Sequence, residues 1–526
     1  MTHASRAAAS RRAALFPLAV SAALALSLLP APSASARGAA GPTAAARRVS
    51  GYLQGIRDRP KALASFFHDL PKGGDLHNHL SGAASTELLL RLAVEDGLCI
   101  DPTDTAIEPP CTGDTRPASD TEHDADFRRE VIRAWSMQDF KPGAESGHDH
   151  FFATFGKFGE ASWRHPGRLV ADVANRAAEQ HQFYLETMLT PASSGAAALA
   201  AKVGWDSDLA RMRRKLLADG GIDRLVRQAR ADADATMAEF HAAAHCGTAH
   251  AEAGCSLPVR FISQVSRSTA PERVFTQLVL GMELAERDPR FVAVDLVQPE
   301  DAPVALRDYT LQMRMLDYLH GQYPGAHITL HAGELVPGLV KPEDLTFHIR
   351  QAVVLGRAER IGHGVDIRHE DGYQDLLQLM ARRHIAVEVP LTSNAQILGV
   401  NGAEHPFPLY RQYGVPVALS TDDEGVERTD ISHEYQRAAL TYRLDYPALK
   451  KLARDSLEYG FLTGHSLWRG RDGYQVVPEC AGDRLGAAHP RTGCSRFLAA
   501  NAKAAVEWKQ EGAFGSFEQK VVNRKA

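Results

Sequence analysis

The sequence has no concentration of positive charge. Its 526 residues include 59 lysines and arginines against 64 aspartates and glutamates, a formal net charge of −5, and no basic block stands out. Because proteins that bind nucleic acid usually present a strongly basic surface, the composition gives no reason to expect such a partner. Hydrophobic residues make up 44% of the chain and charged ones 23%, which is ordinary for a globular protein with a large core.

Cysteine is sparse, and no C-x-x-C motif occurs. That absence argues against a zinc site built from thiolates. The six cysteines instead form three pairs of sequence neighbours: Cys99 and Cys111, Cys246 and Cys255, and Cys480 and Cys494. In an oxidising compartment three local disulfides are the simplest interpretation, although sequence alone does not fix the pairing and buried free thiols remain an alternative.

Long apolar runs are also rare. The one that stands out, residues 13–29, follows an arginine-containing start and precedes the small residues Ala34-Ser35-Ala36. This order is typical of a secretory signal peptide, and Pro17 together with the short length disfavours a membrane anchor. We expect cleavage after Ala36, export by a route that the sequence leaves open, and a soluble mature protein.

Eight short runs rich in apolar and β-branched residues recur along the chain, and most gaps between them hold a helix-forming segment. Strands and helices in alternation predict a (β/α)8 TIM barrel of class α/β. An open doubly wound sheet is the alternative, but it would not readily explain polar residues at the ends of so many strands. The predicted strands are 74–80, 182–189, 259–265, 291–297, 327–331, 360–363, 385–390 and 415–420.

The predicted barrel spans residues 71–470. Residues 1–36 are the expected signal peptide, and residues 37–70 are a leader that is flexible to about residue 48 and contains a helical lead-in. Residues 471–526 are a tail after the barrel, with a helix at 497–518. Two gaps are too long for plain crossovers and predict insertions after the first strand, at 97–158, and the second, at 194–258. The first contains Phe151, Phe152, Phe155 and Phe158 at helical spacing, which usually indicates core packing; a lining role over the active site is the alternative. The insertion as a whole could act as a lid.

Polar residues follow the predicted strands. In a barrel of this type the active site lies at the carboxyl ends of the strands, so these side chains should meet. Any one of them alone would be unremarkable, but together they are unlikely to be coincidental. The set is His77, His79, His331, Glu334, His363, Asp422 and Asp423.

The set contains the donors of a zinc site. Zinc in enzymes takes two or three imidazoles with a carboxylate and leaves a position for water, whose pKa falls towards ~7. His77 and His79, one residue apart, would face the same side of a strand, and His331 and Asp422 complete the four ligands of one zinc ion. Nearby, Glu334 could donate a proton and His363 could act as a base or orient the water.

Several motifs then identify a resemblance. They lie at 72–83, 331–334, 360–364, 390–394, 405–406 and 420–423, in one order across residues 71–465. With them the chain resembles the adenosine deaminase family, and its signal peptide and cysteines make it similar to the secreted branch that includes the adenosine deaminase-related growth factors.

The resemblance implies hydrolytic removal of the 6-amino group of adenosine, 2′-deoxyadenosine or a related 6-aminopurine, with release of ammonia. It implies that His77, His79, His331 and Asp422 bind the zinc and that Asp422 belongs to the catalytic set with Glu334 and His363. Glu334 would protonate ring N1, His363 would position or deprotonate the water, and Asp423 would hydrogen-bond N7. The expected partner is a small purine nucleoside or base, with neither nucleic acid nor, after signal cleavage, membrane; the oligomeric state stays open.

Two departures concern the substrate pocket, which is expected to include His79, Ser81, Gln298 and Asp423. Ser81 stands where nucleoside-binding members carry an acidic residue that reaches the ribose, and Gln298 stands where a glycine N–H faces purine N3. These changes leave the deamination machinery intact but leave the sugar end of the substrate undetermined.

Two other functions account less well for these residues. A two-metal amidohydrolase barrel commonly uses a carboxylated lysine on the fourth strand, where this chain has Asp295 and no lysine. A non-catalytic extracellular binding or signalling protein would not need every catalytic residue type. A further His-x-His, His148-Asp149-His150, has no supporting partners in sequence and is interpreted as a surface or cap feature.

Overall fold

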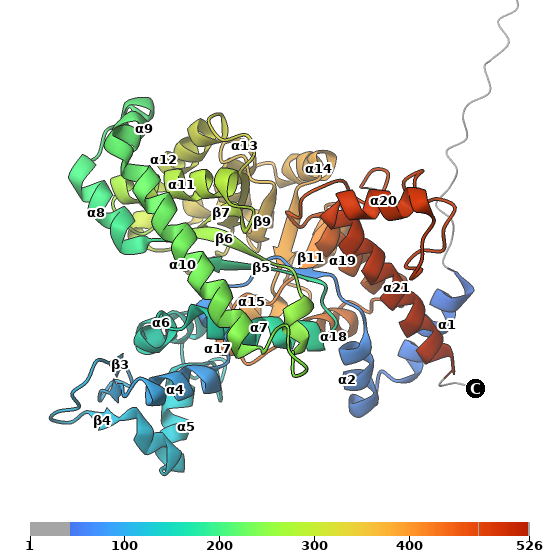
Figure 1. Cartoon of the computed structure of the whole chain (residues 1–526), viewed down its shortest axis with the longest axis horizontal. Helices are drawn as coiled ribbons and strands as arrows, with labels where there is room; N and C mark the ends of the chain where they lie inside the picture. The colour runs from blue at the N-terminus through green and yellow to red at the C-terminus, as the bar shows by residue number, and fades with distance from the viewer. Residues whose placement is uncertain (1–42, 472, 524–526) are drawn as a thin grey trace, which may run out of the picture. The chain divides into compact units, whose positions relative to one another are not determined.

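The computed structural model describes residues 43–471 and 473–523, so the predicted signal peptide lies outside the described residues. Eight parallel strands form a nearly closed barrel in the order β1-β5-β6-β7-β8-β9-β10-β11, which confirms the TIM barrel (Figure 1). Each strand overlaps one predicted run. They are β1 (Gly74–Asp75), β5 (Tyr184–Leu189), β6 (Val259–Ser266), β7 (Phe291–Val297), β8 (His327–Ala332), β9 (Arg360–His363), β10 (Ala386–Val389) and β11 (Val417–Leu419).

The first strand is much shorter than predicted. Regular pairing of β1 ends at Asp75, and the short helix α3 (Leu80–Ala83) begins directly after His79. The seam between the first and last strands is closed by the residues that follow them: His79 N donates to Asp422 O at 3.1 Å, and Asp422 N donates to His77 O at 2.9 Å. Backbone hydrogen bonds therefore bring the two ends of the barrel together at three of the predicted metal ligands.

Helices surround the barrel. The long helical segment of the second insertion is divided into α9 and α10, because Asp219 has a φ of 52° that no α-helix accommodates. The helices of the ring, these two included, follow their strands. They are α4 (Thr86–Glu95), α7 (Pro166–Glu179), α8 (Ser193–Val203), α9 (Leu209–Leu217), α10 (Gly221–Ala243), α11 (Pro271–Arg287), α12 (Pro303–His320), α13 (His348–Val354), α14 (Tyr373–Arg383), α15 (Leu391–Ile397), α16 (Phe407–Gln412), α17 (Glu424–Glu427), α18 (Ile431–Thr441) and α19 (Tyr446–Glu458).

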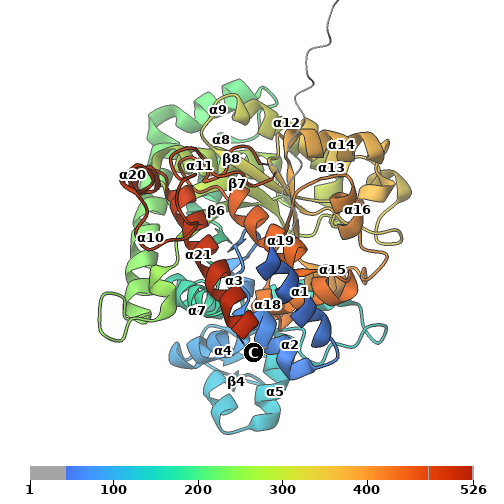
Figure 2. The ribbon, with the colours of Figure 1, turned by 90° about the vertical axis from the view of Figure 1, so that its right-hand side faces the viewer.

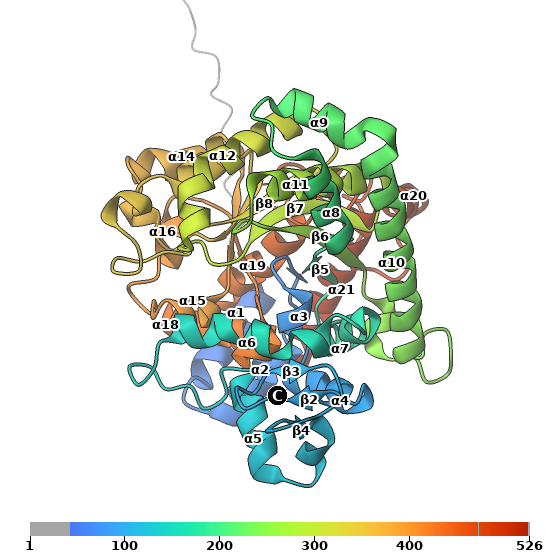
Figure 3. The same cartoon turned by 90° about the vertical axis from the view of Figure 1, so that its left-hand side faces the viewer.

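The first insertion has its own small architecture. Strands β2 (Cys99–Ile100), β3 (Ala106–Ile107) and β4 (Arg116–Pro117) form an antiparallel sheet, followed by α5 (Ala125–Ala134) and α6 (Gly147–Ser162). Helix α6 packs against α4 and α15 and lies between this sheet and the barrel (Figure 3). The insertion is thus placed at one end of the barrel.

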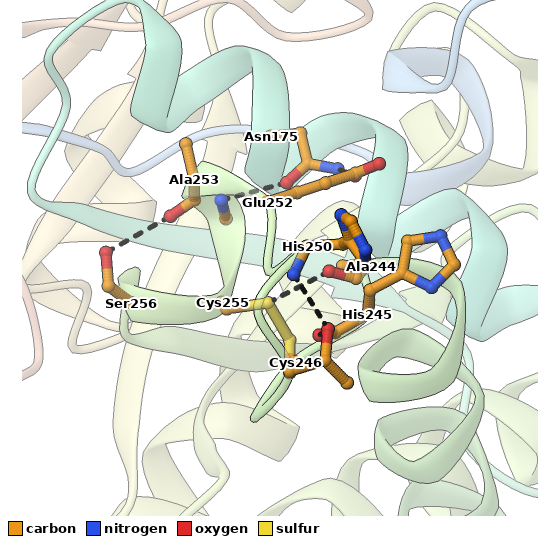
Figure 4. Close-up of a disulfide and its surroundings, with 11 residues drawn as sticks. Asn175, Ala244, His245, Cys246, His250, Glu252, Ala253, Cys255 and Ser256 are labelled. Carbon is orange, nitrogen blue, oxygen red and sulfur yellow. Dashed lines mark hydrogen bonds between the residues drawn. A yellow bond between two sulfur atoms is a disulfide. The ribbon is translucent and has the colours of Figure 1, made fainter.

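All three proposed disulfides are present, with Cα separations of 5.4, 5.4 and 4.6 Å. Figure 4 shows the Cys246–Cys255 bond, which joins the segment after α10 to the segment before β6. Beside it, Asn175 of α7 accepts a hydrogen bond from Gly254 N at 2.8 Å. The disulfide and this hydrogen bond together therefore hold the end of the second insertion against the ring of helices.

The two ends of the described chain pack together. Helix α1 (Ala44–Gly55) lies beside α21 (Ala502–Asn523), and α2 (Pro60–Asp69) packs on α18 (Figure 2). The expectation of a flexible leader to residue 48 is wrong from Ala44 onward, because Val49 and Leu53 bury one face of α1. The predicted tail helix is present as α20 (Thr492–Ala500) and α21. Across the described ranges, no helix has the length and apolar character needed to cross a membrane.

Candidate metal-binding active site

The structure brings the predicted site residues together at the carboxyl end of the barrel. One ligand atom each from His77, His331, His363 and Asp422 lie within 4.8 Å of one another, and all four residues are buried. His79 reaches the same point, because its Nε2 lies 3.1 Å from His331 Nε2 and 3.3 Å from Asp422 Oδ1. Five potential donors therefore surround one position.

Three of these imidazoles have their Nδ1 atoms held by side-chain oxygens, which leaves each Nε2 directed to the common point. Carboxylates or amides in this position orient a metal-binding histidine and raise its basicity. The pairs are His77 with Glu388 at 2.8 Å, His331 with Asp295 at 3.0 Å, and His79 with Gln264 at 3.1 Å.

Glu388 was missed by sequence reasoning. It lies in the middle of β10, between Val387 and Val389, and is fully buried. A carboxylate inside an otherwise apolar strand was the available signal, since a buried charge requires a partner.

The donor set fits a zinc ion. His77 Nε2 is buried and has no hydrogen-bond partner among the described residues, as expected for an atom that binds a metal ion. The separations of 3.1 and 3.3 Å between donor atoms suit two ligands of one ion with bonds of about 2.0–2.1 Å. Burial and the neighbouring imidazoles hold the pKa of His331 well below its usual range, so that this ring is neutral and able to bind a metal.

His363 resembles His79 in that an amide, rather than a carboxylate, lies behind its ring. Its Nδ1 is 2.9 Å from Asn394 Oδ1, and Asn394 Nδ2 is 2.9 Å from His405 Nε2. This series of hydrogen bonds gives a structural role to the motifs at 390–394 and 405–406, which contain Asn394 and His405. His363 Nε2 lies 3.7 Å from Asp422 Oδ2, without a hydrogen-bond partner in the described part of the chain, so that it can face water or substrate.

The two adjacent aspartates have opposite protonation tendencies. Both are buried, and burial together with the neighbouring Asp422 carboxylate raises the pKa of Asp423 well above its ordinary value. The adjacent imidazoles hold the pKa of Asp422 far below its ordinary value in spite of burial. Burial also raises the pKa of Glu334. Asp422 is therefore an anionic donor, whereas Asp423 and Glu334 are suited to carry protons.

A cavity of about 340 Å³ opens beside this cluster. Helix α6 contributes Phe151, Phe152 and Phe155 to the cavity wall, so that these rings have the lining role that was the alternative to core packing. Phe151 is at the same time part of the core, as is Phe158. Among the described residues that line the cavity there is no lysine or arginine. The wall consists of His79, Ser81, Phe151, Phe152, Phe155, Gln264, Ser266, Val297, Gln298, Pro299, His331, Glu334, His363, Asp422 and Asp423.

The two departures noted in sequence both lie at this cavity. Ser81 lines it directly. Gln298 has a φ of 86°, and its side-chain oxygen accepts a hydrogen bond from Ser268 N at 3.2 Å. Because the side chain is engaged by this neighbouring loop, the glutamine can contribute its backbone to the cavity wall.

His148 has a role that its sequence context did not predict. Its Nε2 lies 3.0 Å from Asp301 Oδ1, in the loop after β7, and its ring packs on Phe152 with centroids 4.8 Å apart. The residue therefore joins helix α6, which lines the cavity, to the barrel, a position closer to the cap interpretation than to a surface feature.

Comparison with known proteins agrees with this geometry. The family model of adenosine deaminase matches residues 165–467. Adenosine deaminases of Salmonella typhimurium and Escherichia coli are 39% identical over 140 residues, which is 26% of this chain and only 39% of the length of those relatives. The N6-methyl-AMP deaminase of Arabidopsis thaliana, 21% identical with a TM-score of 0.51, covers 76% of this chain and 94% of its own, and supports the fold. The chain belongs to the adenosine deaminase family.

Proposed function

We propose that this protein is a zinc-dependent hydrolase that deaminates adenosine, 2′-deoxyadenosine or a related 6-aminopurine, giving the inosine-type product and ammonia. Family membership supports a metal-dependent purine deaminase. The observation that carries the proposal is the convergence of three oriented imidazoles and Asp422 beside the buried acid Glu334, at the wall of one cavity.

His77, His79, His331 and Asp422 would hold the metal, with His363 close enough to assist. When bound, zinc supplies Lewis acidity that makes a nearby water nucleophilic at neutral pH. Adding that water to C6 disrupts the aromatic ring, and Glu334, whose pKa is raised by burial, delivers a proton to N1 at the same time. His363 orients the water or accepts its proton through Nε2. That proton would leave with the amino group as ammonia when the C6–N6 bond breaks, and the proton of the new C6 hydroxyl would return to Glu334.

Asp423 would hold the far side of the purine. N7 is a hydrogen-bond acceptor, so that only a protonated carboxyl group can donate to it. The raised pKa of Asp423 supports that form at neutral pH. His79, Ser81 and Gln298 would complete the pocket around the base and the sugar.

We further propose that the substrate is uncharged. A phosphate in the described cavity would lie near the anionic Asp422 and would find no lysine or arginine in the cavity wall to neutralise it. The three phenylalanine rings of α6 instead offer an apolar wall to a flat base and its sugar. A nucleoside or free base therefore fits better than a nucleotide.

The experiment is a substrate panel on the purified chain: adenosine, 2′-deoxyadenosine, adenine, AMP and N6-substituted purines. Loss of adenine absorbance with ammonia release should be faster for a nucleoside than for AMP, and metal analysis should give one zinc ion per chain. Two tightly bound ions would favour a two-metal amidohydrolase, and no turnover of any compound would favour a non-catalytic binding protein. Export is a further proposal, supported by the three disulfides.

A further inference from the structure

Glu300, in the loop after β7, is a buried carboxylate that does not line the cavity. Its two oxygens accept hydrogen bonds from two consecutive backbone N–H groups, those of Gly333 at 3.2 Å and Glu334 at 2.8 Å. These N–H groups belong to the turn that follows β8 and carries the proposed acid. The contact joins the ends of two adjacent strands directly beneath Glu334.

The turn has few other ways to lie. Gly333 has a φ of 75°, and a Cβ atom at this position would come within 2.4 Å of Asp366 Oδ1. Its carbonyl accepts hydrogen bonds from Val365 N at 2.8 Å and Asp366 N at 3.1 Å. The turn is therefore bound on one side by the segment after β9, and on the other side by Glu300 alone among the contacts described.

Glu300 is itself held in place as an anion. His348 Nδ1 lies 2.6 Å from Glu300 Oε1, and Arg267 Nη1 lies 4.0 Å from the same oxygen. Although burial opposes ionisation, the hydrogen bond with His348 and the positive charge of Arg267 keep the pKa of Glu300 below its usual range. The ring of His348 stacks on Tyr309 at 3.8 Å, and the Tyr309 hydroxyl donates to His348 O at 2.8 Å.

Resting on the proposed function, we infer that Glu300 is a positioning residue for the deamination: its carboxylate, oriented by His348, grips the Gly333-Glu334 backbone and fixes the proton donor Glu334 over the substrate. A general acid must lie within hydrogen-bond reach of the atom that it protonates, and a displacement of about 1 Å costs as much as 100-fold in rate. The metal ligand His331 has a support that does not involve Glu300, since Asp295 accepts from His331 N and lies 3.0 Å from its Nδ1.

The test compares Glu300→Gln and Glu300→Asp with Glu507→Gln. The glutamine keeps the shape of Glu300 but loses the charge and one acceptor, whereas the aspartate keeps the charge with a shorter reach. Glu507 is a control for burial and for the loss of one acceptor, because it is buried, accepts a hydrogen bond from Leu467 N at 2.7 Å and lies in the tail away from the cavity.

We expect Glu300→Gln to lower kcat about 10- to 100-fold, the loss typical of supporting residues at such sites, with KM within about twofold and the zinc content unchanged. Glu300→Asp should recover part of the loss, and Glu507→Gln should leave kcat unchanged. A Glu300→Gln protein with wild-type kcat, or one that merely loses zinc, would overturn the inference.

Amide hydrogen exchange supplies a readout that does not depend on turnover. In the wild type the N–H groups of Gly333 and Glu334 should be protected, and Glu300→Gln, but not Glu507→Gln, should accelerate exchange at these two positions. Unchanged exchange at Gly333 and Glu334 in Glu300→Gln would refute the role of Glu300 in holding this backbone, even if the enzyme is active. An inactive wild type with the expected exchange pattern would instead refute the proposed function, and with it the catalytic purpose of the grip.

Discussion

The imidazoles at the candidate metal site depend on partners that never touch the metal position. Asp295 accepts from both His331 N and His331 Nδ1, each at 3.0 Å, so that one carboxylate sets both the backbone and the ring of this ligand. Glu388 has the same place behind His77 and also accepts from Thr329 Oγ1 at 3.0 Å. At the scale of single residues, the site is therefore a layer of donors supported by a layer of buried oxygens.

Replacing Asp295 by alanine tests this support. The change leaves the N–H and Nδ1–H groups of His331 without their acceptor, and we expect zinc affinity to fall about 10- to 100-fold. Chelator competition on the purified variant measures the affinity. Glu507→Gln, which alters a buried carboxylate elsewhere, should leave it unchanged; an Asp295→Ala protein with wild-type affinity would contradict the assigned role.

Glu334 is the second residue-scale prediction. Glu334→Gln keeps the volume and removes the transferable proton, so that kcat should fall by at least about 100-fold, while zinc content is retained. Steady-state kinetics on the best compound of the panel gives kcat, and metal analysis gives the zinc content. An undiminished rate would show that another group protonates N1.

At the scale of elements, the barrel carries the candidate metal-binding residues, and the inserted helix α6 forms part of the cavity wall. Three phenylalanines of α6 face the cavity, and the His148–Asp301 pair fastens the start of this helix to the loop after β7. The hydrogen bond with Asp301 is the main cause that raises the pKa of His148 to about 9, against the opposing effect of burial; Asp149 adds to it.

From the His148–Asp301 ion pair we predict that the position of helix α6 over the cavity depends on pH. The pKa of His148 in the observed arrangement is raised to about 9, above the ordinary histidine value of about 6.5. The ion pair with Asp301 therefore stabilises this position of α6 fully below about pH 6.5, and the stabilisation is lost as the pH rises through 9. Asp301→Asn should raise KM about two- to fivefold at pH 7, the size of a modest ion pair, with kcat unchanged. The wild-type KM should approach that of the variant above pH 9.

Measurement of KM between pH 6.5 and 9.5 checks both statements. Asp149→Asn is the matched control, since Asp149 contacts the other nitrogen of His148 at 3.0 Å but is 79% exposed, and it should change KM less. Equal KM values for the wild type and Asp301→Asn across this range would exclude the fastening role.

At the scale of the whole described chain, elements distant in sequence hold one another. The lead-in helix α1 packs on the tail helix α21, and Tyr446 and Lys450 of α19 both contact Glu518 at 3.0 Å. The disulfides act differently, since each closes a short loop, of 12, 9 or 14 residues in sequence separation, on the periphery. Their contribution should appear in stability and not in the rate of reaction.

Replacing Cys246 and Cys255 together by serine tests whether a disulfide affects stability without affecting the rate of reaction. Closure of a short loop reduces the entropy of the unfolded chain, which corresponds to about 2–3 kcal/mol of unfolding free energy. We expect that loss in urea titration, with kcat and KM at 25 °C unchanged, because neither cysteine lines the cavity. A large fall in kcat of the folded variant would show that the second insertion reaches the active site.

The sequence alone determined the succession of the strands and the motifs at their ends, and it made three local disulfides the simplest interpretation without fixing their pairing. These features are local: apolar runs mark buried strands, and cysteines 9 to 14 residues apart find each other first. The tertiary structure alone decided that Glu388 supports His77 across 311 residues, that Glu300 grips the turn of Glu334, and that His148 meets Asp301. Such contacts depend on strand register and on the path of an insertion, and neither leaves a periodic pattern in the chain.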